Sequence, residues 1–405
     1  MQEEIRARVI QGALATSLSL LGCLVTACGG GTADTTSTAS SAPGTEGLSE
    51  AAELGRLIFA DVTLSASGQQ ACASCHAAGK GHAPDNSLPA QLGGPSLQDQ
   101  GNRNAPTLRY LATNKPFALD ADGTPRGGFF WDGRAASLQE QARQPFLNPL
   151  EMANASAADF TARLARASYA ARFAALYGAD IFSRPDDALQ RAALALQRYQ
   201  LEDSDFAPFN SKFDQFLRGQ AVLTAAETRG LAVFNDPAKG NCAACHPSTR
   251  AADGSHPLFT DFSYDNLGVP RNPALRVNDD ATYFDLGLCS VFGGGQRTDL
   301  CGAFKVPTLR NVAVRGAFFH NGRFASLKDV LRFYATRDTQ PALWYPTLPD
   351  GTVDRFNDVP KAWRSNVNTT EGPLNRQAGQ APAMTESDID DLAAFLATLT
   401  DAPTP

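Results

Sequence analysis

Apolar residues recur at helical spacing in several separate parts of the chain, where side chains three and four positions apart share one face. The longer runs of this kind span residues 158–177, 186–200, 327–336 and 385–399. Thr385, at the start of the last run, suits the N-cap position of a helix. Shorter apolar patterns at 55–61 and 230–236 predict a short helix before each of two cysteine pairs. Between these runs the chain is rich in Gly and Pro, so the pattern predicts a mainly α-helical protein with long irregular connections.

The N-terminal segment has a different pattern, because residues 9–33 carry no charge. Residues 9–27 are mostly apolar and end in Val-Thr-Ala before Cys28, which is the pattern of a lipoprotein signal peptide whose cysteine receives the lipid. The following residues are almost all Gly, Thr, Ser and Ala, a composition typical of a flexible tether. We therefore expect a signal peptide at 1–27, a tether at 28–47 and a periplasmic protein anchored by lipid on Cys28. A plain secretory signal and a single membrane helix are the alternatives.

The eight cysteines of this 405-residue chain are too few for a disulfide scaffold, and they fall into pairs. Two pairs belong to Cys-x-x-Cys-His motifs, which attach c-type haem through two thiols and provide a histidine ligand to the iron. One such motif could be a redox dithiol or half of a zinc site, but two in an exported chain favour haem. We therefore expect two covalently bound haem c groups, held by Cys72, Cys75, His76, Cys242, Cys245 and His246.

The remaining pair, Cys289 and Cys301, lies in a Gly-rich segment. In an oxidising compartment a disulfide is the expected state of this pair, and two free buried thiols are the alternative. The formal net charge of −7 argues against a nucleic-acid partner, which requires a basic face. No segment after the N-terminal one is apolar enough to span a bilayer, so we expect contact with a membrane through the N-terminal lipid only.

An internal repeat organises the rest of the chain. Residues 126–138 read RGGFFWDGRAASL and residues 315–327 read RGAFFHNGRFASL, with nine of thirteen positions identical at a constant offset of 189. Pro-Thr-Leu-Arg also occurs in both halves, at 106–109 and 307–310. The repeat predicts two cytochrome c-like haem domains related by internal duplication, at residues 48–210 and 211–400.

Each haem iron has a second axial position, which His, Met or Tyr can fill. Methionine is scarce, with three in the chain, and Met384 precedes the last predicted helix as a hydrophobic staple would. Tyr334 follows the second repeat, and the offset of 189 relates it to Pro145, which has no ligand atom. If Tyr334 is the ligand in the second domain, the corresponding site of the first is open to a small oxidant. We expect His82 and His256 to be structural.

Several sequence blocks resemble the bacterial dihaem cytochrome c peroxidase family: NAPT at 104–107, FWDGRA at 130–135, NPLEM at 148–152 and KVPTLRN at 305–311. The resemblance runs from about residue 50 to residue 400. It implies that the N-terminal haem reacts with peroxide and that the C-terminal haem passes or stores electrons. Tyr334 stands where typical members have Met, and this difference resembles the MauG-like branch of the family.

The resemblance also implies roles for individual side chains of the first domain. Glu151 would be the acid/base group above the open haem, with Gln141 and Pro145 lining that pocket. Trp131 would relay electrons between the haems, and His320 aligns with it in the second half, at the haem edge or the domain interface. Near residue 96 this chain has no histidine to block the open haem. We therefore expect a five-coordinate haem that needs no reductive activation.

A calcium ion between the haems is a further implication of the resemblance. Its ligands would be the side chain of Asn104 and the main-chain carbonyls of Arg315 and Ala317, the last two differing from the usual residues.

The expected function is therefore reduction of hydrogen peroxide, with a small redox protein as electron donor. The alternative is a MauG-like, peroxide-dependent oxidase that modifies a partner protein or a small substrate. A third hypothesis is an electron-transfer dihaem protein without catalytic activity, which would require both irons to be capped.

Overall fold

The computed structural model describes residues 47–293 and 295–403. The expected signal peptide, Cys28 and all but the last residue of the expected tether lie outside these residues. Within the described part, no helix combines the length and the apolar character needed to cross a membrane.

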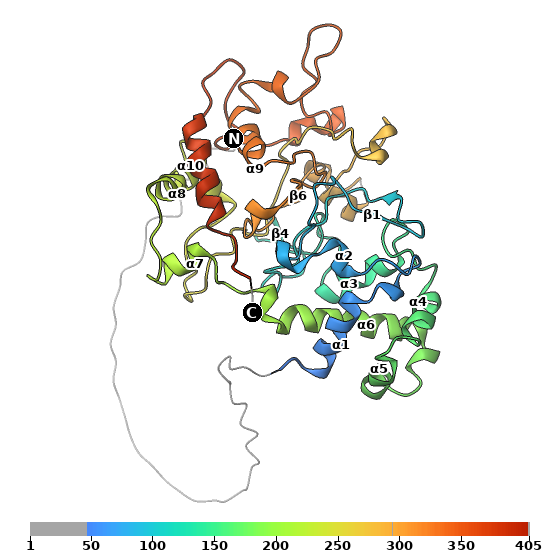
Figure 1. Cartoon of the computed structure of the whole chain (residues 1–405). Helices are drawn as coiled ribbons and strands as arrows, with labels where there is room; N and C mark the ends of the chain where they lie inside the picture. The colour runs from blue at the N-terminus through green and yellow to red at the C-terminus, as the bar shows by residue number, and fades with distance from the viewer. Residues whose placement is uncertain (1–46, 294, 404–405) are drawn as a thin grey trace, which may run out of the picture. The chain divides into compact units, whose positions relative to one another are not determined.

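Helices and irregular loops dominate the described chain (Figure 1). The helices are α1 (Glu50–Ala60), α2 (Cys72–Cys75), α3 (Leu138–Leu147), α4 (Ala157–Leu164), α5 (Ala170–Tyr177), α6 (Pro185–Glu202), α7 (Lys212–Leu217), α8 (Ala225–Asn235), α9 (Leu327–Thr336) and α10 (Glu386–Ala397). Short strands pair antiparallel as β1 (Leu92–Gly93) with β2 (Asp99–Gln100), β3 (Ala118–Leu119) with β4 (Pro125–Arg126) and β5 (Tyr264–Asp265) with β6 (Phe304–Lys305). The prediction of a mainly helical fold is confirmed.

Most of the helices predicted from apolar spacing are present. The run at 327–336 has the bounds of α9, and 186–200 lies within α6. α10 begins after Thr385, whose side chain accepts a hydrogen bond from the Asp388 amide while the Asp388 carboxylate accepts from the Thr385 amide. This capping box satisfies amides that the first turn of a helix leaves unpaired.

The single helix predicted over 158–177 is wrong, because two helices, α4 and α5, occupy this segment. Phe160 and Phe173 are both fully buried in the core of the first half. On one continuous helix their side chains would point about 140° apart around the helix axis, since each residue adds about 100°. The break between the helices lets both rings enter the same core. Tyr169 lies in this break, and its hydroxyl donates to Asp61 at 2.7 Å.

The two halves repeat the same elements in the same register. α3 and α9 have equal lengths, and their bounds differ by the offset of 189 found in the repeat. The isolated β-bridge from Phe129 to Ala135 recurs between Phe318 and Phe324. Pro145 and Tyr334 therefore occupy the same position on equivalent helices. The elements agree with the expected duplication, whereas the domain boundary near residue 210 stays a prediction.

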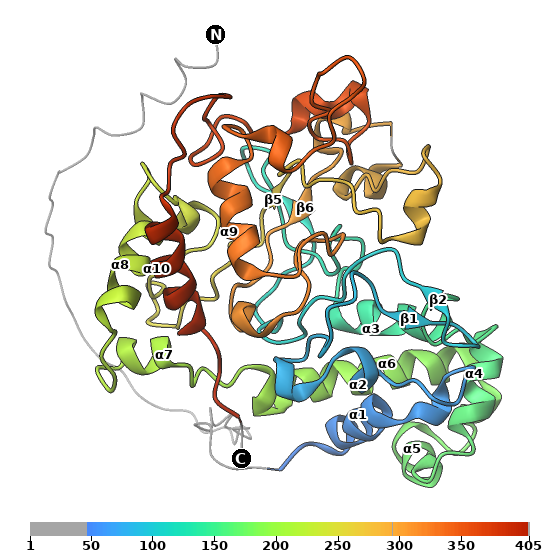
Figure 2. The same cartoon turned by 45° about the horizontal axis from the view of Figure 1, so that its top comes forward.

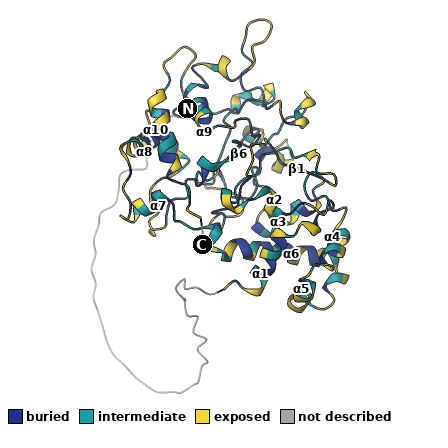
Figure 3. Ribbon diagram, viewed as in Figure 1, coloured by how far each residue is buried: buried dark blue, intermediate teal, exposed yellow. Residues whose placement is uncertain are grey.

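Each half has its own core, built around a close crossing of two helices. In the first half α1 packs across α6, and in the second half α8 packs across α10 (Figure 2). Gly55 on α1 and Gly230 on α8 lie at these crossings. All four of these helices carry buried residues (Figure 3). The crossings place the helices that precede the two Cys-x-x-Cys-His motifs.

The halves are joined by two equivalent main-chain hydrogen bonds. The Asn104 amide donates to the His320 carbonyl at 2.7 Å, and the Lys305 amide donates to the Trp131 carbonyl at 2.8 Å. Trp131 and His320 are related by the offset of 189. In each half, a main-chain amide therefore donates to the carbonyl of the aromatic residue, Trp131 or His320, in the repeat of the other half.

We expect Gly55→Ala and Gly230→Ala to destabilise the fold. A Cβ atom would lie 2.0 Å from the Ala195 carbonyl oxygen in the first case and 2.0 Å from the Asp391 carbonyl oxygen in the second. Overpacking of this kind costs about 1–3 kcal/mol. The free energy of unfolding, measured by denaturant titration, should fall accordingly. Gly79→Ala is the control, since nothing lies within 4 Å of its Cβ position. Equal stability of all three variants would contradict the close crossings.

Candidate functional site

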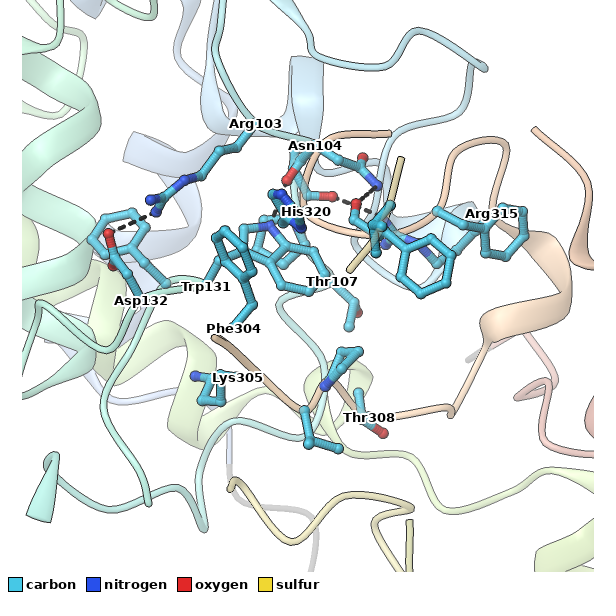
Figure 4. A pocket seen from close by; sticks show the side chains of 18 of the residues that line it. Arg103, Asn104, Thr107, Trp131, Asp132, Phe304, Lys305, Thr308, Arg315 and His320 are labelled. Carbon is cyan, nitrogen blue, oxygen red and sulfur yellow. Dashed lines mark hydrogen bonds and ion pairs between the residues drawn. The ribbon is translucent and has the colours of Figure 1, made fainter. Parts of the chain in front are cut away.

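One cavity of about 690 Å³ is lined by residues of both halves, including both Cys-x-x-Cys-His motifs. Its walls are mainly apolar and aromatic, with a few charged side chains. Trp131 and His320 lie at the centre of the view in Figure 4, with residues of both repeats around them. A large apolar cavity with a small number of polar groups is typical of a cofactor site.

The four cysteines of the motifs are unpaired and enclosed in this cavity. Burial raises the pKa of Cys72, Cys242 and Cys245 to about 12 and that of Cys75 to about 11. The raised pKa values favour the protonated form of these thiols at ordinary pH.

The motif histidines have equivalent environments. The His76 Nδ1 lies 3.1 Å from the His82 carbonyl oxygen, and the His246 Nδ1 lies 2.7 Å from that of Phe259. Because a carbonyl only accepts, each Nδ1 carries the proton and each Nε2 keeps its lone pair. Burial lowers the pKa of His76 to about 4 and also lowers the pKa of His246. A neutral imidazole with an oriented ring is the form that ligates metal.

His82 and His256 are held away from the cavity by carboxylates. The His82 Nε2 lies 2.7 Å from Asp205, which also pairs with Arg109, and the His256 Nδ1 lies 2.6 Å from Asp214. The His82 ring also stacks on Phe206. These contacts agree with the expected structural role of both histidines.

Glu151 lies in the loop after α3 and lines the cavity on the side of Cys75. Its Oε1 accepts a hydrogen bond from the Asn148 side chain at 2.9 Å. Burial raises the pKa of this carboxyl, although Arg134 opposes the shift. The backbone is fixed by Gly93, where a Cβ would lie 2.8 Å from the Glu151 Cα atom. A buried carboxyl of raised pKa in a cofactor cavity is suited to proton transfer.

Gln141 and Pro145 line the same cavity from α3. Proline has no amide proton, so the helical hydrogen bond from position 145 to the Gln141 carbonyl is missing. The wall of the cavity at this point carries an amide side chain and a proline ring and offers no strong metal ligand.

Tyr334 lines the cavity from α9, beside the second motif. Burial raises the pKa of its phenol, and Asp265 and the thiols of Cys242 and Cys245 add to the shift. No hydrogen bond to Tyr334 Oη is formed by the described residues. Met384 lines the cavity as well and belongs to the core of the second half.

Trp131 and His320 mark the junction between the halves (Figure 4). The Trp131 indole donates to the Asn104 carbonyl at 2.8 Å. The His320 ring stacks on Phe304, a residue of the same half, with the ring centres 3.5 Å apart. Both aromatic rings line the cavity. The main-chain carbonyl of each residue accepts a hydrogen bond from an amide of the other half, from Lys305 for Trp131 and from Asn104 for His320.

An ion-pair network that was not predicted from the sequence lies beside this junction. Arg103 bonds to Asp132 at 2.7 Å and to Asp285 at 2.6 Å, and Arg134 bonds to Asp132 at 2.9 Å. Burial opposes charge on Asp285, but Arg103 prevails and lowers the pKa of this carboxyl. Asp132 and Arg134 are charged residues within the repeat, and they are the sequence feature from which this network could have been predicted.

Cys289 and Cys301 form a disulfide in the structure, and both are buried. The disulfide closes a loop that begins shortly after Asp285. The Asp285 carboxylate accepts a hydrogen bond from the Gly287 amide at 3.1 Å.

The residues expected to bind calcium do not fit this ion. Asn104 directs its Nδ2 donor at the carbonyls of Ala317 and Phe319, at 3.0 and 3.2 Å. Its Oδ1 atom is buried without a hydrogen-bond partner, which alone would suit a cation. The Arg315 guanidinium, however, donates to the same Ala317 carbonyl at 3.4 Å. Rotating the side-chain amide of Asn104 by about 180°, so that Oδ1 takes the place of Nδ2, would leave the Arg315 guanidinium at the Ala317 carbonyl. Calcium requires six to eight oxygen ligands and is repelled by a guanidinium on one of them.

Comparison with known proteins agrees with this site. The family model described as di-haem cytochrome c peroxidase matches residues 49–222. The methylamine utilization protein MauG of Paracoccus denitrificans (strain Pd 1222) is 36% identical over 357 residues, covering 86% of this chain and 88% of that protein. Cytochrome c551 peroxidase of Nitrosomonas europaea is 32% identical over 287 residues, covering 69% of this chain and 71% of that protein.

Among solved structures, the diheme peroxidase BthA from Burkholderia thailandensis E264 superposes with a TM-score of 0.82. It is 41% identical, and the match covers 87% of this chain and 86% of that chain. The matches to the Paracoccus protein and to BthA, over 86% and 87% of this chain, are long enough to include both motifs and both repeats. This chain belongs to the dihaem cytochrome c peroxidase family, in its MauG-like branch.

Proposed function

We propose that this protein reduces hydrogen peroxide at an open N-terminal haem, while its C-terminal haem stores or relays the oxidising equivalents. The observation that carries the proposal is the difference between equivalent positions of α3 and α9. Pro145 provides no ligand atom where Tyr334 provides a phenol oxygen. This asymmetry leaves one haem face open, and it disfavours an electron-transfer protein with both irons capped.

The cavity fits two haems attached through the motif thiols. His76 and His246 would ligate the two irons through Nε2, because Nδ1 of each ring is bound to a main-chain carbonyl. When bound, the haem iron supplies the redox chemistry and the site at which peroxide binds.

Glu151 carries the proton chemistry of the proposed reaction. As a carboxylate it accepts the proton of the attacking peroxide oxygen, and as a carboxylic acid it returns that proton to the leaving oxygen. Asn148 fixes one of its oxygens, so the other is directed to substrate. Gln141 and Pro145 restrict the space beside it and keep competing ligands out.

Tyr334 is the proposed axial ligand of the C-terminal haem. Its phenol keeps its proton in a buried site beside acidic groups, and a metal cation at Oη would reverse that preference. An anionic oxygen ligand favours the higher oxidation states of iron, so it suits a haem that stores oxidising equivalents.

Trp131 is the proposed relay between the haems, since its ring lies in the shared cavity at the junction of the halves. Electrons would come from a small redox protein. A second candidate function is the peroxide-dependent oxidation of a partner protein or small substrate. The 36% identity with the methylamine utilization protein MauG favours this second candidate, and both functions use the same site residues.

We also propose a periplasmic location with a lipid anchor on Cys28. The proposed covalent attachment of haem and the disulfide between Cys289 and Cys301 both suit an oxidising compartment outside the cytoplasm.

Glu151→Gln should lower the rate of peroxide turnover by about 10²-fold or more, because the variant keeps the hydrogen bond from Asn148 and loses the titrating group. The raised pKa of Glu151 places the acid limb of the wild-type pH profile above the range of an ordinary glutamate, with activity falling as the carboxylate is protonated. The variant should lack this limb. Steady-state peroxide consumption across pH, with several electron donors and without prior reduction, tests both expectations.

Glu140→Gln is the matched control, because Glu140 accepts a hydrogen bond from the Ala136 amide and is not part of the cavity wall. It should retain the wild-type rate and profile. A wild-type protein that consumes no peroxide with any donor would refute the proposed function. Equal rates for wild type and Glu151→Gln would refute the role of Glu151 alone.

Tyr334→Phe should change the absorption and electron paramagnetic resonance signals of one haem and leave those of the other unchanged. Tyr345→Phe is the control, because this buried tyrosine of the same half donates to the Gly268 carbonyl and does not line the cavity. An unchanged spectrum for Tyr334→Phe would exclude Tyr334 as the ligand and leave Met384, which lines the same cavity.

A further inference from the structure

Two cationic side chains in the cavity have no carboxylate partner. Arg315 and Lys305 both line the cavity, and among the described residues no carboxylate forms an ion pair with either (Figure 4). Neither residue has a role in the peroxide chemistry proposed above. Their positive charges therefore require another explanation.

The internal duplication provides a comparison for Arg315. Its equivalent in the first half, Arg126, pairs with Asp120 at 2.6 Å and with Asp261 at 2.7 Å. Arg315 instead donates only to main-chain carbonyls, to Ala105 at 2.9 Å and to Ala317 at 3.4 Å. Burial without a carboxylate lowers the pKa of Arg315 to about 10. The same residue at the same repeat position is thus neutralised in one half and not in the other.

Lys305 is in a similar position on the other side of the junction. Its ammonium donates to the Gly128 carbonyl at 2.5 Å and lies over the Phe129 ring. Burial lowers the pKa of Lys305 to about 7, and the Asp132 carboxylate, which forms no ion pair with it, opposes this shift. Asn104 makes the equivalent contact in the first half, with the Ala317 carbonyl. Lys305 thus places a positive charge where the other half has a neutral amide.

An uncompensated charge in a low-dielectric site is costly, and proteins normally pair it. The walls of this cavity leave both cations unpaired by carboxylates. A haem carries two propionate carboxylates, which are ionised at neutral pH. Two haems would therefore supply the anions that the protein lacks, within the cavity that both cations line.

Each cation lies next to the chain segment that contacts one motif histidine. Arg315 binds the carbonyl of Ala105, and the next residue, Pro106, has its main chain against the His76 ring. Lys305 is two residues before Pro307, whose main chain contacts the His246 ring. One cation is thus available for each haem.

We propose that Arg315 binds a propionate of the N-terminal haem and that Lys305 binds a propionate of the C-terminal haem. This inference rests on the proposed attachment of haem at both motifs. It also explains why the expected calcium site does not fit, because the Arg315 guanidinium already provides a positive charge beside Asn104 and Ala317. The junction then needs no divalent cation.

Removing either charge should lower the reduction potential of its own haem, because ferric haem carries one more positive charge than ferrous haem and a nearby cation disfavours it. We expect Arg315→Gln to shift the N-terminal haem to a more negative potential and Lys305→Gln to shift the C-terminal haem. Glutamine keeps a donor for the carbonyls of Ala105 and Gly128, so each variant removes charge with little change in packing. Spectroelectrochemical titration of the purified holoprotein resolves the two potentials.

The charge-conserving variants Arg315→Lys and Lys305→Arg are the controls and should keep potentials close to wild type. Unchanged potentials in both Gln variants, at full haem content, would overturn the proposal. So would an equal shift in the charge-conserving variants. Haem content is measured separately by the pyridine haemochrome assay. A wild-type protein without haem would instead refute the attachment on which the inference rests.

Treatment of the wild-type holoprotein with EGTA, followed by gel filtration, should leave the haem spectra, both potentials and the thermal midpoint unchanged. Arg315 is covalently part of the chain and cannot be removed by a chelator. A spectral change that is reversed by added calcium would show that a metal ion supplies the positive charge at this position.

Discussion

The site depends on the exchange of two main-chain hydrogen bonds between the halves, from Asn104 to His320 and from Lys305 to Trp131. Each bond ties the segment before a Pro-Thr-Leu-Arg sequence to the aromatic residue of the other half's repeat. Because these contacts are made by the backbone, they are independent of which side chains occupy the positions. The halves can therefore keep one relative geometry while their side chains diverge, and a single cavity forms between two separate helical cores.

The proposed function depends on differences between the side chains at equivalent positions of the two halves. Equivalent positions carry Pro145, which has no ligand atom, and Tyr334, whose phenol oxygen is the proposed iron ligand. Another pair of equivalent positions carries Arg126, which pairs with two aspartates, and Arg315, which forms no ion pair with a carboxylate of the described residues. Such substitutions require no change in the helix crossings. In both halves those crossings rely on a glycine, since a larger residue would meet the partner helix.

Much of this arrangement could be predicted from the sequence, because a repeat preserves register. The offset of 189 placed Pro145 and Tyr334 at equivalent positions before the helices were known. The helix at 158–177 could not be predicted correctly, since apolar periodicity does not reveal that two rings on opposite faces enter one core. The hydrogen-bond partners of Arg315 could not be predicted from the sequence either. Arg126 is the same residue in nearly the same local sequence, and only the folded chain shows that one has carboxylates nearby and the other does not.

The buried charges also connect the proposed proton-transfer group to the junction. Glu151 has its pKa raised by burial and lowered by Arg134, so its proton affinity depends on where Arg134 is held. Asp132 holds Arg134 and is itself bound by Arg103, which in turn is bound by Asp285 of the second half. Because each link is a short ion pair, a displacement of the halves would alter the field at the carboxyl. The proton affinity of the N-terminal site therefore depends on contacts with the half that carries the second haem motif.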